Sequence, residues 1–426
     1  MREKLGSRLG FLMLAAGCAV GLGNVWRFPF VVGRNGGAAF VLVYLVFLSL
    51  FGLPLLLAEL AVGRGGGAGV VGAFRNLGGR IWGRIGYVVF AGNLLLMMYY
   101  TDVAGWLVKF TSDYAVFGAP PEFSALVADK PVCLAFMLAA VAVSSCVCAA
   151  GVRRGVERVT KWMMLALLAL MGVLAAKALA LDGAAKGLAF YLKPDWTPLL
   201  EHPGRVVFEA MGQAFFTLSI GVGAMTILGS YAERRESLVK EAVLIVAIDT
   251  FVAFSAGLIV FPACATYGVD VTSGPGLIFD ALPKVFAAMP GGRLWGGVFF
   301  LFMSLAALTT IVAEFECLVG GLVDEWRLGR LAAAAVVGCA VALLSLPCVF
   351  VSGALEIEDF IFSKFWLPLG GLAFALFASW RFGWGWENFR REASAGRGVA
   401  LPEWSRHVLR YVVPAIILLV IVGGLV

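Results

Sequence analysis

The stretch Gly17-Cys-Ala-Val-Gly-Leu-Gly-Asn-Val-Trp-Arg-Phe-Pro29 lies in the middle of an apolar segment that runs from about Leu9 to Val32. A segment of that length can cross a bilayer as one helix. Its centre nevertheless holds residues that a continuous lipid-facing helix would avoid, namely Gly17, Gly21, Gly23, Asn24, Arg27 and Pro29. Backbone leaves helical geometry at membrane depth only where protein or a water-filled cavity satisfies its free N–H and C=O groups. The stretch therefore predicts a helix that is broken at mid-membrane around a binding site.

Glycines at positions 17, 21 and 23 make local unwinding sterically cheap. The freed carbonyls can then turn toward a cation, while the N-terminus of the following half-helix faces an anion. The alternative is a helix-packing motif, because Gly17 and Gly21 form a small-xxx-small pair. That alternative leaves Asn24 and Arg27 unexplained, so we favour the broken helix.

Composition places the chain among polytopic membrane proteins. Of its 426 residues 61% are hydrophobic and only 14% are charged, and the mean hydropathy is +0.93. The net charge of +6 comes from basic residues in short loops between apolar spans, which indicates membrane topology rather than a nucleic-acid partner. The eight cysteines lack metal-site or redox spacing, and the two histidines fall in predicted loops. We therefore expect no enzymatic activity.

Hydropathy predicts an all-α protein with eleven spans, at roughly 9–33, 37–62, 81–110, 132–150, 157–181, 206–230, 239–267, 294–322, 331–350, 359–381 and 408–426. Basic residues precede the first span and recur in alternate loops, so the N-terminus is predicted to be cytoplasmic and the C-terminus external. Between Leu277 and Ala288 we expect a short external helix.

The sixth span, Met211-Gly-Gln-Ala-Phe-Phe-Thr-Leu-Ser-Ile-Gly-Val-Gly-Ala224, repeats the pattern of the first. Two interrupted spans that lie five spans apart predict a five-plus-five inverted repeat, with the site where the two breaks meet. We expect a single transmembrane transporter domain, 1–426, with 9–181 as the first repeat, 206–381 as the second and 408–426 as an additional helix. The alternative is a chance match in a pore-forming or enzymatic membrane protein.

Polar residues inside the spans are functional candidates by default. Asn24, Thr217 and Asp249 offer hard oxygens that suit a small cation. Thr309 and Thr310 could join carbonyls freed in the first span to form a second cation site. The alternative for these two threonines is hydrogen bonding back to their own helix.

Several motifs together resemble the neurotransmitter:sodium symporter family, in its bacterial amino-acid branch: Gly17–Pro29, Tyr99-Tyr100 with Trp106, Gln213–Gly223, and Ala306-Ala-Leu-Thr-Thr310. The resemblance runs from Arg2 to about Pro414. It implies a Na⁺-coupled symporter that imports an α-amino acid across the bacterial inner membrane. It also implies alternating access, in which spans 1, 2, 6 and 7 rock against spans 3, 4, 8 and 9, in a monomer or homodimer.

The resemblance implies two sodium sites. The first resembles the Ala19 carbonyl with Asn24, Thr217, Asp249 and the substrate carboxylate. The second resembles a set of carbonyls and hydroxyls from Gly17, Val20, Ala306, Thr309 and Thr310. Tyr44 and Gln213 match positions of the family's chloride site, where an acidic substitute can lie at the position of Ala253 or, as here, at Asp249. Chloride is therefore not expected to be required.

For the substrate, the resemblance implies hydrogen bonds to its carboxylate from Tyr100 and from the N–H groups of Leu22 and Gly23. The ammonium group would meet carbonyls of Ala19, Phe216, Thr217 and Ser219, and Phe216 and Tyr100 would form a lid. Arg27 and Asp359 would be the outer gate, and Arg2, Asp324 and Tyr231 the inner gate. For the charged gate residues the alternative is ordinary charge at helix ends.

Three positions bear on specificity. Amine-transporting members of the family have aspartate at the position of Gly21, and a glycine leaves room for an amino acid that brings its own carboxylate. Val222 suggests a wider side-chain pocket than usual. Glu314 could recognise a cationic or hydrogen-bonding side chain of the substrate, or it could pair with Lys364, which is the alternative we prefer because either charge buried alone would be costly.

A second function class uses the same site without transport, namely a membrane amino-acid sensor or receptor. Such a protein should carry a cytoplasmic signalling domain or a long tail. The short loops of this chain favour the symporter.

Overall fold

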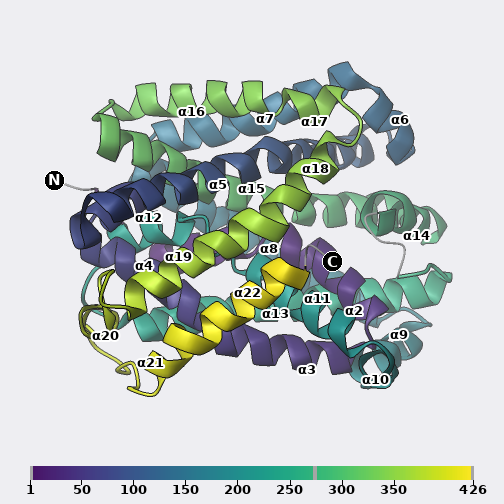
Figure 1. The fold of residues 1–426 in the computed structure, drawn as a ribbon. Coiled ribbons are helices and arrows are strands. Elements are labelled where there is room, and N and C mark those ends of the chain that lie inside the picture. The colour runs from purple at the N-terminus through teal and green to yellow at the C-terminus, as the bar shows by residue number, and fades with distance from the viewer. Residues whose placement is uncertain (1–2, 272–275, 424–426) are drawn as a thin grey trace.

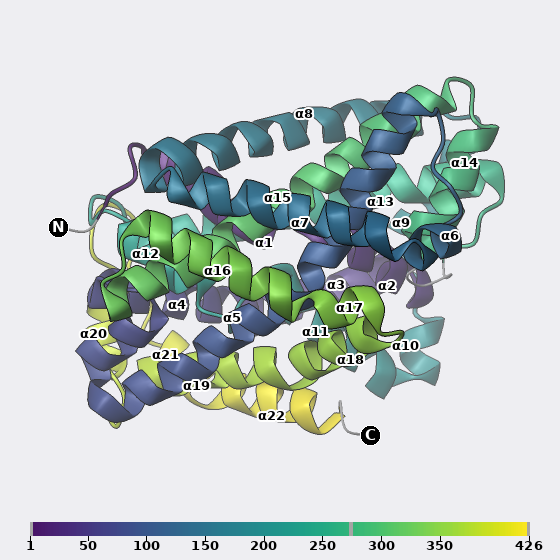
Figure 2. The same cartoon turned by 90° about the horizontal axis from the view of Figure 1, so that it is seen from above.

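The computed structural model describes residues 3–271 and 276–423, and in these ranges the chain is helical, with isolated bridges but no β-strand. Most helices run lengthwise between two ends of the molecule (Figure 1). A group of short helices lies at one end, and α20 (Trp386–Ala393) lies at the other end. Figure 2 shows the same division from above. The short helices at the first end are α6 (Phe123–Ala128), α9 (Ala184–Leu192), α10 (Thr197–Glu201) and α14 (Leu282–Ala288).

The first half of the chain contains a broken element followed by four long ones. The broken element comprises α1 (Arg8–Ala19), the π-helical segment η1 (Gly23–Arg27) and α2 (Phe28–Arg34). The long ones are α3 (Ala38–Phe47) with η2 (Leu48–Gly52) and α4 (Leu53–Gly66), then α5 (Val70–Val116), α7 (Lys130–Ala149), and η3 (Val152–Glu157) with α8 (Arg158–Leu179).

The second half begins with another broken element, α11 (Pro203–Thr217) and α12 (Ala224–Tyr231). The long elements after it are α13 (Leu238–Tyr267), α15 (Gly292–Trp326), α16 (Arg330–Leu344) with α17 (Leu346–Phe350), and α18 (Ala354–Ile361) with η5 (Phe362–Trp366) and α19 (Leu367–Ser379). The last element joins α21 (Ser405–His407), η6 (Val408–Val412) and α22 (Val413–Gly423). The short helix expected between Leu277 and Ala288 is present as η4 (Leu277–Ala281) with α14, and its external location stays a prediction.

Nine helical stretches of the described ranges are long and apolar enough to cross a membrane, and a bent pair raises this number to ten. The bent pair is Arg8–Ala19 with Gly23–Arg34, at an angle of 54°. The sixth expected span, 206–230, is divided between α11 and α12, neither of which is long enough alone. The structure thus has several helices of membrane-spanning length, as predicted, while the count of eleven stays a prediction.

The two broken elements lie among helices of both halves. α1 packs against α8, α13 and α15, and α12 packs along α4 and also against α15. α15 in turn runs along α5. The ends of the breaks are therefore enclosed by protein, which is the condition under which irregular backbone is stable at membrane depth. The candidate site lies between these two breaks, inside the surrounding helices.

Local sequence explains where the first helix begins and ends. The Ser7 side chain accepts a hydrogen bond from the Gly10 N–H at 2.9 Å and caps α1. The helix stops at Ala19, where Val20 turns to extended geometry with φ −71° and ψ 95°. Helical geometry resumes at Gly23. The break predicted within Gly17–Pro29 is therefore present.

Candidate functional site

Asn24, Thr217 and Asp249 form one buried cluster, although they come from η1, α11 and α13. The Asn24 amide donates to Asp249 Oδ1 at 2.7 Å and to Thr217 Oγ1 at 3.1 Å. Thr217 Oγ1 donates to Asp249 Oδ2 at 3.0 Å. All three residues are 0% exposed. The structure thus brings together the three side chains that the sequence predicts for the first sodium site.

The donor set of this cluster suits a small hard cation. It offers carboxylate, hydroxyl and amide oxygens, which are the ligands that such cations prefer. The partners of the Asp249 carboxylate within residues 3–271 and 276–423 are neutral, and a buried carboxylate without a positive partner is costly. Ala19, predicted to add its carbonyl, is the buried last residue of α1.

A second set of oxygens converges on Thr310. Its Oγ1 lies 3.3 Å from the carbonyl oxygens of Gly17, Val20 and Ala306. A hydroxyl carries one hydrogen, so it can satisfy only one of these three acceptors at a time. The Gly17 and Val20 carbonyls therefore lie where the predicted second sodium site needs them, whereas the Ala306 carbonyl also accepts a hydrogen bond from the Thr309 hydroxyl.

Thr309 behaves differently from Thr310. Its hydroxyl donates to the carbonyls of Leu305 at 3.0 Å and Ala306 at 2.9 Å, within its own helix. This is the back-bonding that the sequence offered as the alternative for both threonines. The lone pairs of this hydroxyl oxygen are not used by these bonds, so the back-bonding is compatible with the predicted role of Thr309 as an ion ligand.

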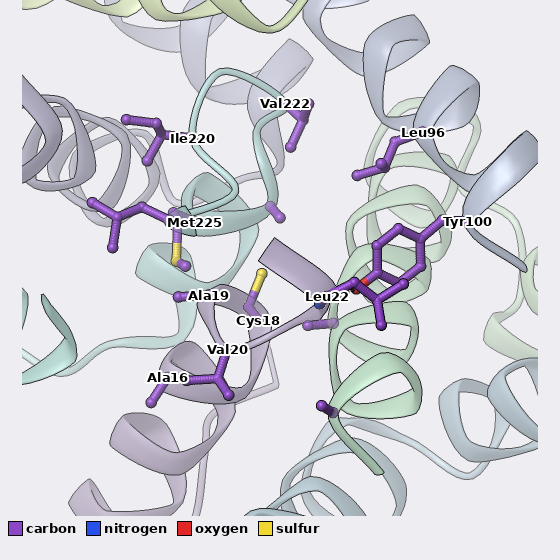
Figure 3. Close-up of a cluster of buried hydrophobic side chains, with 14 of the residues drawn as sticks. Ala16, Cys18, Ala19, Val20, Leu22, Leu96, Tyr100, Ile220, Val222 and Met225 are labelled. Carbon is purple, nitrogen blue, oxygen red and sulfur yellow. Dashed lines mark hydrogen bonds between the residues drawn. The ribbon is translucent and has the colours of Figure 1, made fainter. Parts of the chain in front are cut away.

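A small cavity lies beside the breaks. It has a volume of about 20 Å³ and is lined by Ala19, Gly21, Gly23, Leu96, Tyr100, Phe216, Ser219, Thr310, Phe362 and Leu367. Figure 3 shows Leu22 next to Tyr100, with Leu96 on the same helix as Tyr100 and Val222 on the chain between α11 and α12. The Leu22 N–H donates to Tyr100 Oη at 3.0 Å. Two of the groups predicted to bind a substrate carboxylate thus already contact each other.

Gly21 sits where a side chain would not fit. A Cβ atom at this position would lie 2.6 Å from Tyr100 Oη and 2.7 Å from Thr310 Oγ1. A residue with a side chain would therefore displace groups of the predicted substrate and sodium sites. This contact gives a steric reason for glycine at position 21.

The break between α11 and α12 needs a backbone that only glycine adopts readily. Gly221 has φ +97° and Gly223 has φ +83°. A Cβ atom at Gly221 would lie 2.3 Å from the Leu367 carbonyl oxygen. Ser219 is also left-handed, with φ +48°, and its Oγ donates to the Cys18 carbonyl at 3.2 Å. This bond joins the two breaks directly.

Glu59 on α4 is a site residue that the sequence reasoning missed. Its side chain is fully buried, and its Oε1 accepts a hydrogen bond from the Gly221 N–H. The carboxyl group therefore satisfies a backbone donor that the break leaves free. An acidic residue inside the apolar run Leu55-Leu-Leu-Ala-Glu-Leu60 was the available signal.

Comparison with known proteins identifies the family to which this chain belongs. A family model described as "Sodium:neurotransmitter symporter family" matches residues 2–118 and 128–426. The chain belongs to this family. The sodium-dependent transporter YhdH of Bacillus subtilis (strain 168) is 33% identical over 97% of this chain and 96% of its own length. The sodium- and chloride-dependent taurine transporter of Homo sapiens is 30% identical over 76% of this chain and 61% of its own length.

A solved structure of a symporter of this kind matches along the whole chain. It is the crystal structure of MhsT in complex with L-phenylalanine, with a TM-score of 0.88 and 36% sequence identity, and the match covers 100% of both chains. The predicted family is therefore confirmed, and relatives in this family are membrane transporters. The fold with two broken helices is the symporter fold.

Arg27 and Asp359, the residues predicted for the outer gate of this symporter-family chain, interact electrostatically but form no direct ion pair in the described ranges. The Arg27 guanidinium lies over the Phe216 ring, 5.0 Å from its centroid. Asp359 Oδ1 accepts a hydrogen bond from Ser363 Oγ at 3.0 Å. Arg27 thus contacts the residue predicted to be the lid.

Of the residues predicted for the inner gate, Arg2 lies outside the described residues. Asp324 Oδ2 accepts a hydrogen bond from the Gly69 N–H at 2.7 Å. Tyr231 Oη donates to Glu316 Oε1 at 2.5 Å, and Glu316 is also paired with Arg330. Asp324 therefore holds the start of α5, and Tyr231 joins a charged cluster that the sequence reasoning did not name.

The preferred ion pair between Glu314 and Lys364 is not formed. Glu314 is fully buried and accepts hydrogen bonds from Asn93 Nδ2 at 2.5 Å and from Cys18 Sγ at 3.7 Å. Lys364 lies over the Phe208 ring, 4.3 Å from its centroid. The two side chains therefore have different neighbours, because Lys364 contacts α11 through Phe208 while Glu314 contacts Asn93 and Cys18. Glu314 does not line the small cavity, and its contact with substrate stays a prediction.

The residues at the predicted chloride position surround the same cluster. Gln213 Nε2 donates to the Gly23 carbonyl at 2.9 Å, and Tyr44 is buried with its hydroxyl unpaired in the described part of the chain. Ala253 lies buried on α13, one helical turn from Asp249. Of the two positions predicted for an acidic substitute, 249 carries the carboxyl group and 253 does not.

Proposed function

We propose that this protein is a Na⁺-coupled symporter that imports an α-amino acid across the bacterial inner membrane. The observation that carries the proposal is the buried cluster of Asn24, Thr217 and Asp249. It joins a broken first helix to α11 and α13 beside the cavity at Tyr100. Membership in a family of sodium-dependent transporters supports the same function.

Substrate and sodium would bind together through one group. The substrate carboxylate would take the hydrogen bonds of Tyr100 Oη and of the Leu22 and Gly23 N–H groups. It would also supply an oxygen to the sodium held by Asn24 and Asp249. Each ligand would then raise the affinity for the other, and this reciprocal gain is the physical basis of coupling. An amine without a carboxylate would lack the shared oxygen.

The ammonium group of the substrate would meet carbonyl oxygens where the two helices break. Ala19, Phe216, Thr217 and Ser219 are the residues proposed for this role, and Val222 and Glu314 remain those proposed for its side chain. The amino acid bound to MhsT, L-phenylalanine, supports an α-amino acid as the substrate class. Asp249 would supply the negative charge that other family members obtain from chloride, so chloride should not be required.

Transport would require the closed site to open on one side at a time. The cavity of about 20 Å³ holds about one water molecule, whereas an amino acid is far larger. Arg27 and Asp359 would part on the outer side, and Arg2, Asp324 and Tyr231 on the inner side. Eleven spans, with repeats at 9–181 and 206–381 and a further helix at 408–426, would place the N-terminus in the cytoplasm and the C-terminus outside.

Thermal stabilisation of the purified protein tests the binding site. Each of the twenty amino acids is added in Na⁺ and, separately, in K⁺, with serotonin and dopamine as amine controls. A ligand that binds only the folded protein raises the unfolding temperature. We expect stabilisation by one or more amino acids in Na⁺ only. If no amino acid stabilises folded protein in Na⁺, the proposal is wrong.

Uptake into proteoliposomes separates a symporter from a sensor that uses the same site. An inward Na⁺ gradient should drive accumulation of the stabilising amino acid, and a negative interior should add about 2.3 kcal/mol per charge for each 100 mV. A K⁺ gradient of equal size is the control. Binding without accumulation would favour the sensor.

A further inference from the structure

Asp102 is a buried acidic residue that the transport site does not use. It lies on α5 and is 1% exposed. Both of its carboxyl oxygens lack a hydrogen-bond partner, and no ion pair among residues 3–271 and 276–423 includes it. Asp113, on the same helix and equally buried, is by contrast paired with Lys109.

The position of Asp102 on α5 directs it away from the sodium sites. It follows Tyr100 by two residues, which is about 200° around a helix, and follows Tyr99 by three, which is one turn. Tyr99 packs on Phe362 of η5, with ring centroids 6.0 Å apart. Asp102 therefore shares the face of α5 that α18 and η5 cover, and α18 carries the outer-gate residue Asp359.

Four titratable groups from three other elements face Asp102. They are Lys130 and Cys133 of α7, Cys348 of α17 and Glu358 of α18. Glu358 is half-buried, and its Oε2 accepts a hydrogen bond from Cys348 Sγ at 3.2 Å. Lys130 is the only cation among these four, and it lies beyond ion-pair distance. The surroundings thus add a second negative charge and no close positive one.

An ionised carboxylate in this place would be strongly destabilised. Burial without hydrogen bonds costs several kcal/mol for a charged group. The described residues contain no group of three or more His, Cys, Asp or Glu side chains that could hold a metal ion. A proton neutralises a carboxylate without needing ligands or space.

We propose that Asp102 binds a proton while α18 packs on α5, and that it releases this proton to the external side when α18 moves away. The reaction is the dissociation of a carboxylic acid to a carboxylate and a hydrated proton, so it needs no other reactant. Water reaching Asp102 would stabilise the carboxylate. Repulsion from Glu358 would then hold α18 apart, so protonation favours the closed outer gate. The movement of α18 rests on the proposed alternating access, whereas the bound proton does not.

Infrared spectroscopy of the purified protein tests the bound proton directly. A protonated carboxyl group gives a C=O band that a carboxylate lacks. Subtracting the spectrum of Asp102→Asn from that of the unmodified protein at neutral pH should reveal this band. Asp113→Asn is the matched control and should show no such difference, because Asp113 is paired with Lys109. A difference spectrum without the band would overturn the proposal, whether or not the protein transports amino acids.

The link to the gate is tested by binding as a function of pH. If the closed state holds one more proton, the apparent substrate affinity falls as pH rises, by at most tenfold per pH unit. Asp102→Asn should remove this dependence of substrate affinity on pH (the slope of affinity against pH), because the asparagine amide imitates the protonated acid. Glu358→Gln should keep the slope but move its midpoint to lower pH. A slope that Asp102→Asn leaves unchanged would contradict the gating role. If no amino acid bound at all, the proposed function would fail while the infrared result would still decide the proton site.

Discussion

At the scale of single residues, Asp249 stands out because its charge has no basic partner among the residues described. Its two carboxyl oxygens are held by Asn24 and Thr217, which are both neutral. The geometry places a carboxyl group where a cation and the substrate carboxylate are proposed to meet. Two like charges at such a place are tolerable only when a cation lies between them.

Replacing Asp249 with asparagine should weaken sodium binding and introduce a response to chloride. A charge pair near 4 Å contributes about 4 kcal/mol at an effective dielectric constant of 20, so at least about a tenfold loss of sodium affinity is expected. Sodium titrations of thermal stability, with chloride or gluconate as the anion, measure both effects. Asp195→Asn, at an exposed loop position, is the control. Unchanged sodium affinity in the Asp249→Asn protein would show that this carboxylate has another role.

Gly21→Ala should abolish substrate binding while leaving the protein folded. The added methyl group would lie within 2.7 Å of Tyr100 Oη and Thr310 Oγ1, and overpacking of this size costs about 1–3 kcal/mol. Gly172→Ala is a suitable control, since no atom lies within 4 Å of its added Cβ. Amino-acid-dependent stabilisation in Na⁺ is the readout. Normal binding by the Gly21→Ala protein would mean that Tyr100 moves aside without loss.

At the scale of elements, the break between α11 and α12 depends on a side chain from a different helix. Glu59 of α4 accepts the Gly221 N–H, and Gly221 itself lies against the Leu367 carbonyl of α19. The irregular segment 218–223 is thus held from both sides. Its geometry is set by these neighbours as much as by its own glycines.

The pair Glu59→Gln and Glu59→Leu tests this support. Glutamine keeps an oxygen acceptor for the Gly221 N–H, whereas leucine leaves that donor buried and unpaired at a cost of about 1–3 kcal/mol. We expect Glu59→Leu to lower the unfolding temperature and to weaken Na⁺-dependent binding far more than Glu59→Gln. Equal effects of the two substitutions would indicate that the hydrogen bond is unimportant.

Much of the element pattern could be predicted because its causes are local. Clustered glycines and polar residues in an apolar run indicate a break wherever it occurs, and both breaks are present. The support from Glu59 could not be predicted, because it depends on which helix packs beside Gly221. The preferred pair of Glu314 with Lys364 was wrong for the same reason, since charge in a sequence does not specify distance. The division of the sixth span similarly leaves the count of eleven open.

At the scale of the whole molecule, Arg64 connects several segments at the end of the molecule that carries α20. Its guanidinium is paired with Glu392 at 2.8 Å and donates to the carbonyls of Glu236 at 3.1 Å and Ala395 at 3.3 Å. Its side chain is 2% exposed. One buried arginine therefore connects α4, the chain before α13, and the segment after α20.

Arg64→Ala should destabilise the protein by about 3 kcal/mol and expose the segment around α20 to proteases. The substitution removes the buried one of the two arginines that pair with Glu392, so only the largely exposed Arg234 still pairs with it. It also leaves the Glu236 and Ala395 carbonyls without this donor. Arg75→Ala is the matched control, because Arg75 pairs with Glu325 while its own side chain is 45% exposed, and such pairs contribute about 0–1 kcal/mol. Thermal unfolding and limited proteolysis compare the two variants. Similar stability of both would show that the contacts of Arg64 are replaceable.

The small size of the cavity beside Tyr100 should also prevent sodium ions from leaking through the closed molecule. A space of about 20 Å³ admits about one water molecule, so it cannot hold an ion together with its hydration shell. An ion entering alone would have to exchange almost all of its water for protein oxygens, without the oxygen that an amino acid brings. The closed molecule should therefore conduct almost no sodium current when substrate is absent, which would preserve the sodium gradient for the proposed coupled import.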